Sequence, residues 1–301
     1  MPPGRESFFN SMLVLKDENG DKLFNVLQVK MACDVCIKSG KAAECRHVSV
    51  LPPWKADRLS FVKLLYGDRE DLLKRESLGL SAMDPNSIFK EEWVERAWGK
   101  QSRPRPRTIF VGYDPCGGGE SEWGLVSVCL EGGHLHLLGA EAMRGESAPA
   151  VLEAILQHIL RLRGVWGKVP VVFVPESNLG LEAAHAHHYL KQRLPSYRCV
   201  SEKRVGVCTT HARKVLMAKG LECLFLKDAV SLSEKFVSGK GALKKLKAQL
   251  LNYKKTRNDM RSGRSTLVLT GKDTGNDDLA MALQIVSFWA EKCLTGVASY
   301  V

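Results

Sequence analysis

The chain has 301 residues, of which 45% are hydrophobic, and this length suits one large domain or two smaller ones with a sizeable core. Lysine and arginine outnumber aspartate and glutamate by 44 to 33, so the net charge of +11 favours polyanionic partners, with nucleic acid as the first candidate. No apolar run has the length of a signal peptide core or approaches the ~20 residues of a membrane-spanning helix, which argues against membrane insertion and indicates a soluble, intracellular protein.

The first fifty residues are predicted to contain a hairpin and a metal site. The segment FNSMLVLKDENGDKLFNVLQVK has the pattern of two strands joined by an ENGD turn. The nine cysteines are an odd number and mostly scattered, which indicates reduced thiols and not a disulfide framework. One group is close together: Cys33, Cys36, Cys45 and His47 have the spacing of a tetrahedral site for one structural Zn²⁺. The alternative is that these are four ordinary side chains near a turn.

Residues 51–100 are predicted to form a helical connector, in which EEWVERAWGK is a helix and Trp93 and Trp98 are packing residues. The polar, proline-broken segment QSRPRPR at residues 101–107 is the best domain boundary. We therefore divide the chain into an N-terminal region of residues 1–106 and a second domain of residues 107–301. The three arginines of the boundary segment either contact a phosphate backbone or belong to a solvated linker.

The second domain begins with an element order that predicts an α/β fold. Three antiparallel strands are followed by a crossover helix, a buried strand and another helix, in the segments 109–113, 124–131, 135–141, 148–162, 169–175 and from about 180 onward. This order is the opening of a ribonuclease-H-like core, in which helices flank a mixed sheet. Further on, the sequence predicts a strand at Glu222–Leu226, a short helix at Val230–Phe236, a basic helix at about Lys240–Tyr253 and a final helix beginning at Asp277 and Asp278.

Three of these elements place an acid at a rigid end. Asp114 ends the first strand, Glu176 ends the fourth, and Asp277 and Asp278 start the last helix. Hydrolysis of a phosphodiester is favoured by two divalent ions roughly 3.5–4 Å apart, and Mg²⁺ or Mn²⁺ prefers carboxylate ligands. The acids therefore form a candidate catalytic site for two such ions. Taken singly, Asp114 also fits an ordinary turn, and the two aspartates also fit a helix cap.

Longer motifs around these acids resemble a known family. The segments YDPCGGGESEWG, VVFVPESNLGLEAAHAHHYL and LTGKDTGNDDLAMALQIVSFWA are similar to the three nuclease motifs of the terminase large subunit, the DNA-packaging enzyme of herpesviruses and tailed bacteriophages. Asp114-Pro115, Glu176-Ser177-Asn178 and Gly271-Lys272 with Asp277-Asp278-Leu279 occupy the motif positions in order. The helix segment LKAQLLNYKK and the cysteine-rich stretch are also similar to parts of the herpesvirus branch.

The resemblance implies an endonuclease that cuts double-stranded DNA with two Mg²⁺ or Mn²⁺ ions. Its metal ligands are expected to be Asp114, Glu176 and Asp278, with Asp277 as the second choice for the last position. It also implies an ATPase motor domain, other terminase subunits and a portal as partners, and the host nucleus as the location if the source is herpesvirus-like. The chain has no GxxxxGK[ST] phosphate loop, so ATP hydrolysis is not expected of it.

Basic residues near the third motif are expected to contact the DNA backbone, and these are Lys272, Lys244, Lys245, Lys254, Lys255 and Arg257. A plain solvent-exposed lysine is the alternative for Lys272. His185, His187 and His188 are expected to be surface or packing residues and not metal ligands. Two rival functions remain: another ribonuclease-H-like enzyme of the resolvase or transposase type, and a non-catalytic DNA-binding assembly module.

Overall fold

The computed structural model describes residues 16, 33–41, 45, 47, 86–115, 121–179, 181–239, 241–259, 265–270, 276–294 and 299–300. The predicted N-terminal hairpin and most of the predicted connector lie outside these residues. The chain divides into two compact units, Met1–Ser87 and Ile88–Val301. In the first unit, the described residues contain one short helix, α2 (Asp34–Lys38).

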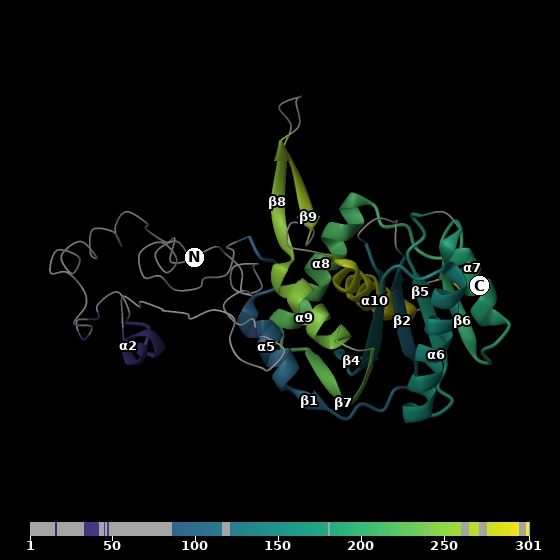
Figure 1. The fold of residues 1–301 in the computed structure, drawn as a ribbon, viewed down its shortest axis with the longest axis horizontal. Helices are drawn as coiled ribbons and strands as arrows, with labels where there is room; N and C mark the ends of the chain where they lie inside the picture. The colour runs from purple at the N-terminus through teal and green to yellow at the C-terminus, as the bar shows by residue number, and fades with distance from the viewer. Residues whose placement is uncertain are drawn as a thin grey trace. The chain divides into compact units, whose positions relative to one another are not determined.

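The second unit is built on a mixed sheet, as predicted (Figure 1). Its strands run in the order β1-β7-β4-β3-β2-β5-β6-β10. The pairs β2–β3, β3–β4 and β6–β10 are antiparallel, and the remaining neighbours are parallel. The strands are β1 (Gln101–Ser102), β2 (Ile109–Asp114), β3 (Trp123–Glu131), β4 (His134–Met143), β5 (Val171–Pro175), β6 (Tyr197–Ser201), β7 (Val230–Ser238) and β10 (Ser299–Tyr300). The three antiparallel strands β2–β4 with parallel β5 and β6 confirm the predicted ribonuclease-H-like arrangement.

Helices cover both faces of this sheet. They are α5 (Glu91–Gly99), α6 (Ala148–Trp166), α7 (Glu182–Lys191), α8 (His211–Leu226), α9 (Ala242–Asn252) and α10 (Asp278–Leu294). Alternate residues of a strand point to opposite faces. Ile109, Val111 and Tyr113 of β2 pack with α6 and α7 in one core cluster, whereas Gly112 faces α10. Helices α8 and α9 contact α10 and so lie on its side.

The start of the predicted boundary segment belongs to the second unit. Gln101 and Ser102 form β1, which pairs in parallel with β7, and α5 immediately before it packs on β7, α8 and α9. The predicted helix EEWVERAWGK is confirmed as α5, and its Trp93 is buried. The β1–β7 pairing and the packing of α5 show that the last part of the predicted connector belongs to the unit that contains the sheet.

Two predicted elements are wrong. The predicted strand at Glu222–Leu226 is the end of helix α8, which the Thr210 side chain caps and whose buried residues Met217, Leu221 and Phe225 recur every four positions. The predicted helix at Val230–Phe236 is strand β7, because this segment pairs in parallel with both β4 and β1. Pairing with distant strands outweighs the local pattern at Val230–Phe236.

A two-stranded antiparallel hairpin follows the basic helix. It consists of β8 (Lys254–Asp259) and β9 (Ser265–Thr270), and Figure 1 shows it standing out from the body of the second unit. The predicted basic helix itself is confirmed as α9. Within the described part of the chain, no helix combines the length and apolarity needed to cross a membrane.

Candidate metal centre

Asp114 and Glu176 meet because β2 and β5 are adjacent parallel strands that end at the same edge. Tyr113 of β2 is in register with Pro175 of β5, and the Glu176 backbone N–H donates to the Tyr113 carbonyl oxygen at 2.8 Å. Tyr113 faces α6, so Asp114, one residue later, points to the face covered by α10. The same alternation puts Glu176 on that face, because Phe173 belongs to the α6 core.

Helix α10 brings Asp278 to the same place, and two glycines allow its close approach. A Cβ atom on Gly124 would lie 2.5 Å from the Asp278 carbonyl oxygen, and one on Gly112 would lie 2.4 Å from the Ala282 carbonyl oxygen. The Asp278 carboxylate is then oriented by the loop before β3. The Glu122 backbone N–H donates to Oδ2 at 3.0 Å, and the Ser121 hydroxyl donates to Oδ1 at 3.2 Å.

The gathered acids are buried and interact. Asp114, Glu176, Asp277 and Asp278 are each between 5% and 8% exposed. Burial, the charge of Glu176 and a hydrogen bond with it, and the charge of Asp278 raise the pKa of Asp114 well above its usual value. The charges of Asp277 and Asp114 both contribute, after burial, to raising the pKa of Tyr253. Buried like charges of this kind suit hard divalent cations as counter-ions.

The Glu176 carboxylate is held by two neighbours. The Asn178 side-chain amide donates to its Oε1 at 3.1 Å, and the Thr209 hydroxyl donates to the same oxygen. Asn178 in turn accepts from the Thr209 backbone N–H at 3.0 Å. The last residue of the PESN motif therefore orients its acid, a role that the motif alone did not indicate.

Lys214 of α8 is a site residue that the sequence did not reveal. Its positive charge lowers the pKa of Asp114 against the larger effects of burial and the other acids. No local signal distinguishes this lysine from its neighbours in HARKVLMAKG, because its relation to Asp114 depends on how α8 packs against α10.

A pocket of about 870 Å³ has in its wall Ser177, the residue that follows Glu176 in the chain. The Ser177 hydroxyl is buried and, among the described residues, has no hydrogen-bond partner. Arg213 donates to Glu202 at 2.5 Å and to the Cys208 carbonyl oxygen at 2.8 Å. The complete lining is Ser177, Glu202, Lys203, Arg204, Gly206, Cys208, Thr210 and Arg213. Three cations against one acid make this pocket basic.

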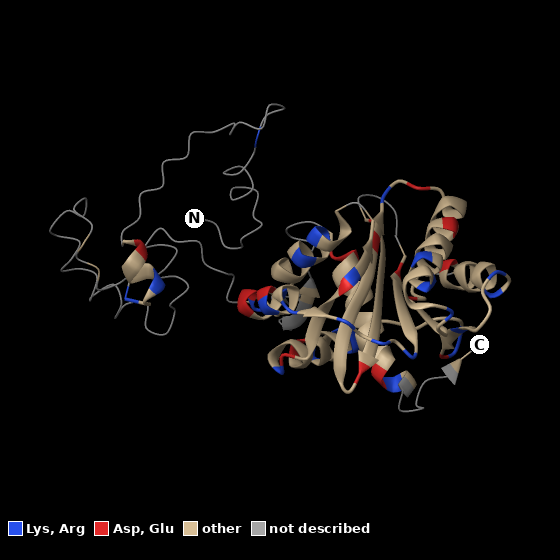
Figure 2. Ribbon diagram, turned by 90° about the horizontal axis from the view of Figure 1, so that it is seen from below, with Lys and Arg blue, Asp and Glu red and all other residues tan. Residues whose placement is uncertain are grey.

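The predicted DNA-contacting residues have different surroundings. Lys244 of α9 is exposed, whereas the Lys245 ammonium contacts both carboxylate oxygens of Glu122, at 2.8 and 2.9 Å. Strand β8 contains Lys254, Lys255 and Arg257. Lys272 lies outside the described residues. Figure 2 shows basic residues over several helices and loops of the second unit, among acidic ones.

The histidines of α7 are packing or surface residues, as expected. His187 is buried beside Tyr197, with 3.4 Å between Nδ1 and the tyrosine hydroxyl, and burial lowers its pKa. His185 and His188 are exposed.

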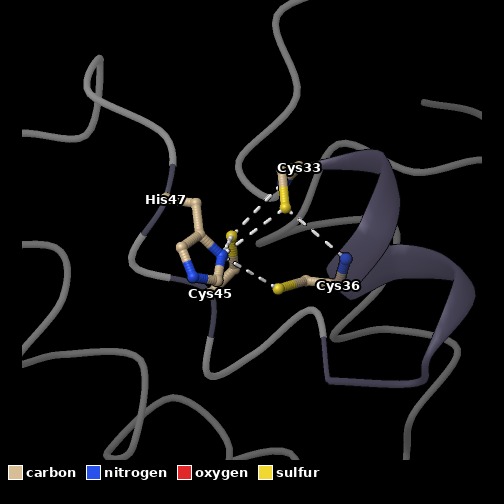
Figure 3. A group of neighbouring side chains, drawn as sticks. All are labelled: Cys33, Cys36, Cys45 and His47. Atoms are coloured by element: carbon tan, nitrogen blue, oxygen red, sulfur yellow. Dashed lines mark hydrogen bonds between the residues drawn. The ribbon is translucent and has the colours of Figure 1, made fainter.

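The Cys/His group of the first unit also comes together. The Sγ atoms of Cys33, Cys36 and Cys45 and a ring nitrogen of His47 all lie within 4.8 Å of one another (Figure 3). This cluster and the acid site belong to different units of the chain.

Comparison with solved structures identifies proteins with the same fold. The nuclease domain of human cytomegalovirus terminase, soaked with Mn and with an inhibitor bound, matches with a TM-score of 0.56 and 14% identity, over 70% of this chain and 99% of that one. The same domain soaked with Mn alone matches with a TM-score of 0.53 and 13% identity over the same shares. No protein-family model and no curated protein sequence matches the chain. The second unit thus has the ribonuclease-H-like fold of a terminase nuclease domain.

Proposed function

We propose that this chain is a metal-dependent endonuclease that hydrolyses double-stranded DNA, as the nuclease part of a viral DNA-packaging terminase. The observation that carries the proposal is the convergence of Asp114, Glu176 and Asp278, from two strand ends and a helix start, on one buried edge of the sheet. The likeness in fold to a terminase nuclease domain soaked with Mn supports the reaction class.

The three carboxylates fit Mg²⁺ or Mn²⁺ as ligands. They offer hard oxygen donors, and burial together with the charges of Glu176 and Asp278 raises the pKa of Asp114, so a bound cation would stabilise the ionised carboxylates. Asp278 is the preferred third ligand over Asp277, since its charge acts on Asp114 and its carboxylate is held by Ser121 and Glu122. When bound, two such ions supply Lewis-acid stabilisation of the entering and leaving oxygens of the phosphodiester.

Other side chains of the site position the carboxylates and supply positive charge. Asn178 and Thr209 fix the Glu176 carboxylate, so that a ligand oxygen is preorganised before metal arrives. Lys214 holds a positive charge beside Asp114 and is suited to stabilise charge on a phosphoryl oxygen. The Ser177 hydroxyl and the Lys203 and Arg204 side chains of the basic pocket are suited to contact DNA phosphates.

The proposal also names residues that contact the DNA backbone and proteins that act as partners. We assign backbone contacts to Lys244 on α9 and to Lys254, Lys255 and Arg257 on the hairpin, with Lys272 near the scissile phosphate. In packaging, such a nuclease acts with an ATPase motor, other terminase subunits and a portal. The division of the chain into residues 1–106 and 107–301 remains part of this proposal.

The decisive experiment is a plasmid-cleavage assay on the purified chain with Mn²⁺ or Mg²⁺. Asp114→Asn and Glu176→Gln are each expected to reduce the rate on the order of 10³-fold, because each removes a metal ligand. Glu146→Gln, which changes an exposed glutamate before α6, is the matched control and should cleave like wild type. Equal cleavage by wild type and both site variants, or no cleavage by wild type with either ion, would overturn the proposal in favour of a non-catalytic module.

A further inference from the structure

We infer that Cys33, Cys36, Cys45 and His47 bind one structural Zn²⁺ in the first unit of the chain. This site is independent of the proposed nuclease centre, because it lies in a different unit and has a different donor chemistry. The four ligand atoms lie at short distances from one another, the backbone of the turn holds them, and few buried apolar residues surround them in the described part of this unit.

The distances between ligand atoms match those of a tetrahedral zinc site. The His47 Nδ1 atom lies 3.3 Å from the Cys36 Sγ, 3.7 Å from the Cys33 Sγ and 3.9 Å from the Cys45 Sγ. Zinc–sulfur bonds of ~2.3 Å and a zinc–nitrogen bond of ~2.05 Å at tetrahedral angles put sulfur and nitrogen about 3.6 Å apart. In Figure 3 the three sulfur atoms surround one ring nitrogen of His47.

The backbone is arranged to hold thiolates. Cys33 is the N-cap of α2, and its Sγ accepts from the Cys36 backbone N–H at 3.5 Å. The Cys33 backbone N–H donates to the Cys45 Sγ at 3.2 Å. Gly40 ends this turn with a φ of 73°, a left-handed conformation in which glycine is unstrained, and the chain can therefore reverse toward Cys45. The two cysteines of the CxxC turn thus face the returning segment.

The donor set selects the metal and its role. Three thiolates and one imidazole are soft or borderline ligands, which favour Zn²⁺ over Mg²⁺, Mn²⁺ or Ca²⁺. The protein supplies all four positions, so no position is open for a substrate, and the site is structural. The exposed Lys38 and Lys41 lie on the same turn, where their charge compensates the net negative charge of a zinc ion with three thiolates.

The surroundings indicate why a metal is useful there. Among the described residues of the first unit, only Cys36 and Cys45 are buried, with Cys33 and Ile37 partly buried against them, while Val35 is 75% exposed. So small an apolar cluster contributes little stability, and metal–ligand bonds replace it in domains of this kind.

The test measures metal directly on the full chain, purified without chelator. Elemental analysis is expected to find about one zinc per chain in wild type and near zero in Cys36→Ser and His47→Asn. Cys223→Ser, which changes an exposed free thiol on α8, is the matched control and should keep its zinc. Zinc in wild type well below one per chain, or equal zinc in wild type and Cys36→Ser, would overturn the inference.

Two further measurements cover variants that fail to fold. Modification of the wild-type thiols with an organomercurial should release the zinc in step with loss of reactive cysteines, whereas a Cys33–Cys45 disulfide would leave fewer free thiols and no zinc to release. Replacement of zinc by Co²⁺ should give the intense visible absorption of a tetrahedral thiolate site, and a weak octahedral spectrum would contradict it. None of these readouts requires DNA cleavage, so failure of the zinc site and failure of the nuclease proposal are distinguishable.

Discussion

The two ligand clusters of this molecule are assembled in different ways. The Cys/His cluster takes its ligands from one short stretch, Cys33 to His47, so a single turn and a returning segment suffice. The acid site takes Asp114, Glu176 and Asp278 from β2, the end of β5 and α10. The first is specified by local spacing and the second by the packing of a whole sheet, so the acid site should be far more sensitive to changes in the core.

The clusters also differ in size and charge. The four soft ligand atoms lie within 4.8 Å of one another, which is compact enough for one ion, and no three acids in the described residues are equally close. Without metal, burial and then the charges of Glu176 and Asp278 disfavour the ionised form of Asp114, which raises its pKa. The acid site is therefore expected to cost stability until its ions bind.

The largest expected effect comes from the contact that closes the acid site. Gly124→Val would push β-branched atoms into the Asp278 backbone, because even a Cβ atom would lie 2.5 Å from its carbonyl oxygen. We expect at least about 3 kcal/mol of destabilisation in denaturant unfolding and complete loss of cleavage. Gly164→Ala in α6, where a Cβ meets nothing within 4 Å, is the control and should be neutral or stabilising.

The same variant separates the two clusters. Because the Cys/His site is local, Gly124→Val should keep its zinc while losing nuclease activity. A stable and active Gly124→Val protein would mean that α10 does not approach β3 as described.

Lys214 gives the next effect. Lys214→Met removes a positive charge that acts on Asp114, and we expect kcat to fall about 10–100-fold with the fold retained. Lys219→Met, an exposed lysine on the same helix, should leave kcat unchanged. A change confined to KM that grows with salt would instead make Lys214 a contact to the DNA backbone.

One substitution at Asp114 is expected to change how the free energy of unfolding depends on metal. In EDTA, Asp114→Asn should raise the free energy of unfolding at neutral pH by about 1–2 kcal/mol, since it removes a group whose ionised form is disfavoured by burial and by the neighbouring acids. With Mg²⁺, wild type should gain stability and the variant should gain little. Thermal unfolding with and without metal measures both, and a variant that is less stable than wild type in EDTA would argue against repulsion among the acids.

The pH dependence has a definite sign. Because the folded-state pKa of Asp114 is raised, its contribution to metal-free stability is complete below the unfolded-state pKa and is lost as the pH rises through the raised pKa. Asp114→Asn should remove this alkaline loss. Asp228 is the contrasting case: although partial desolvation opposes it, contacts of this half-exposed side chain with Lys100 and Arg96 lower its pKa, so its small contribution is lost as the pH falls instead.

The strand ends were predictable from the sequence. An apolar run that stops on an acid predicts a strand, and the alternation of side chains predicts the face of the sheet on which that acid lies. Asp114 and Glu176 follow this rule, and the fold prediction was right around them. The error at Glu222–Leu226 arose because ECLFL is a short apolar run whose period does not distinguish a strand from a buried helix. At Val230–Phe236, pairing with β4 and β1 decides the structure, and no local pattern carries that information.

The supporting residues were not predictable for the same reason. The roles of Lys214, Thr209 and Glu122 depend on contacts between elements far apart in sequence, whereas the CxxC and CxH spacing already contains the geometry of its cluster. Charge density along α9 suggested one role for Lys244 and Lys245, but the structure gives these neighbours different surroundings.

This pair of lysines provides the smallest and most specific prediction. Lys245 holds the Glu122 carboxylate, and the Glu122 backbone N–H donates to Asp278, so Lys245→Met should loosen a metal ligand and lower kcat a few-fold, with a higher requirement for Mg²⁺. Lys244→Met should instead raise KM for DNA and reduce its salt dependence, with kcat unchanged. Kinetics over a range of Mg²⁺ and salt concentrations distinguish these outcomes. If both variants changed only KM, both lysines would act on DNA, and α9 would have no part in positioning Asp278.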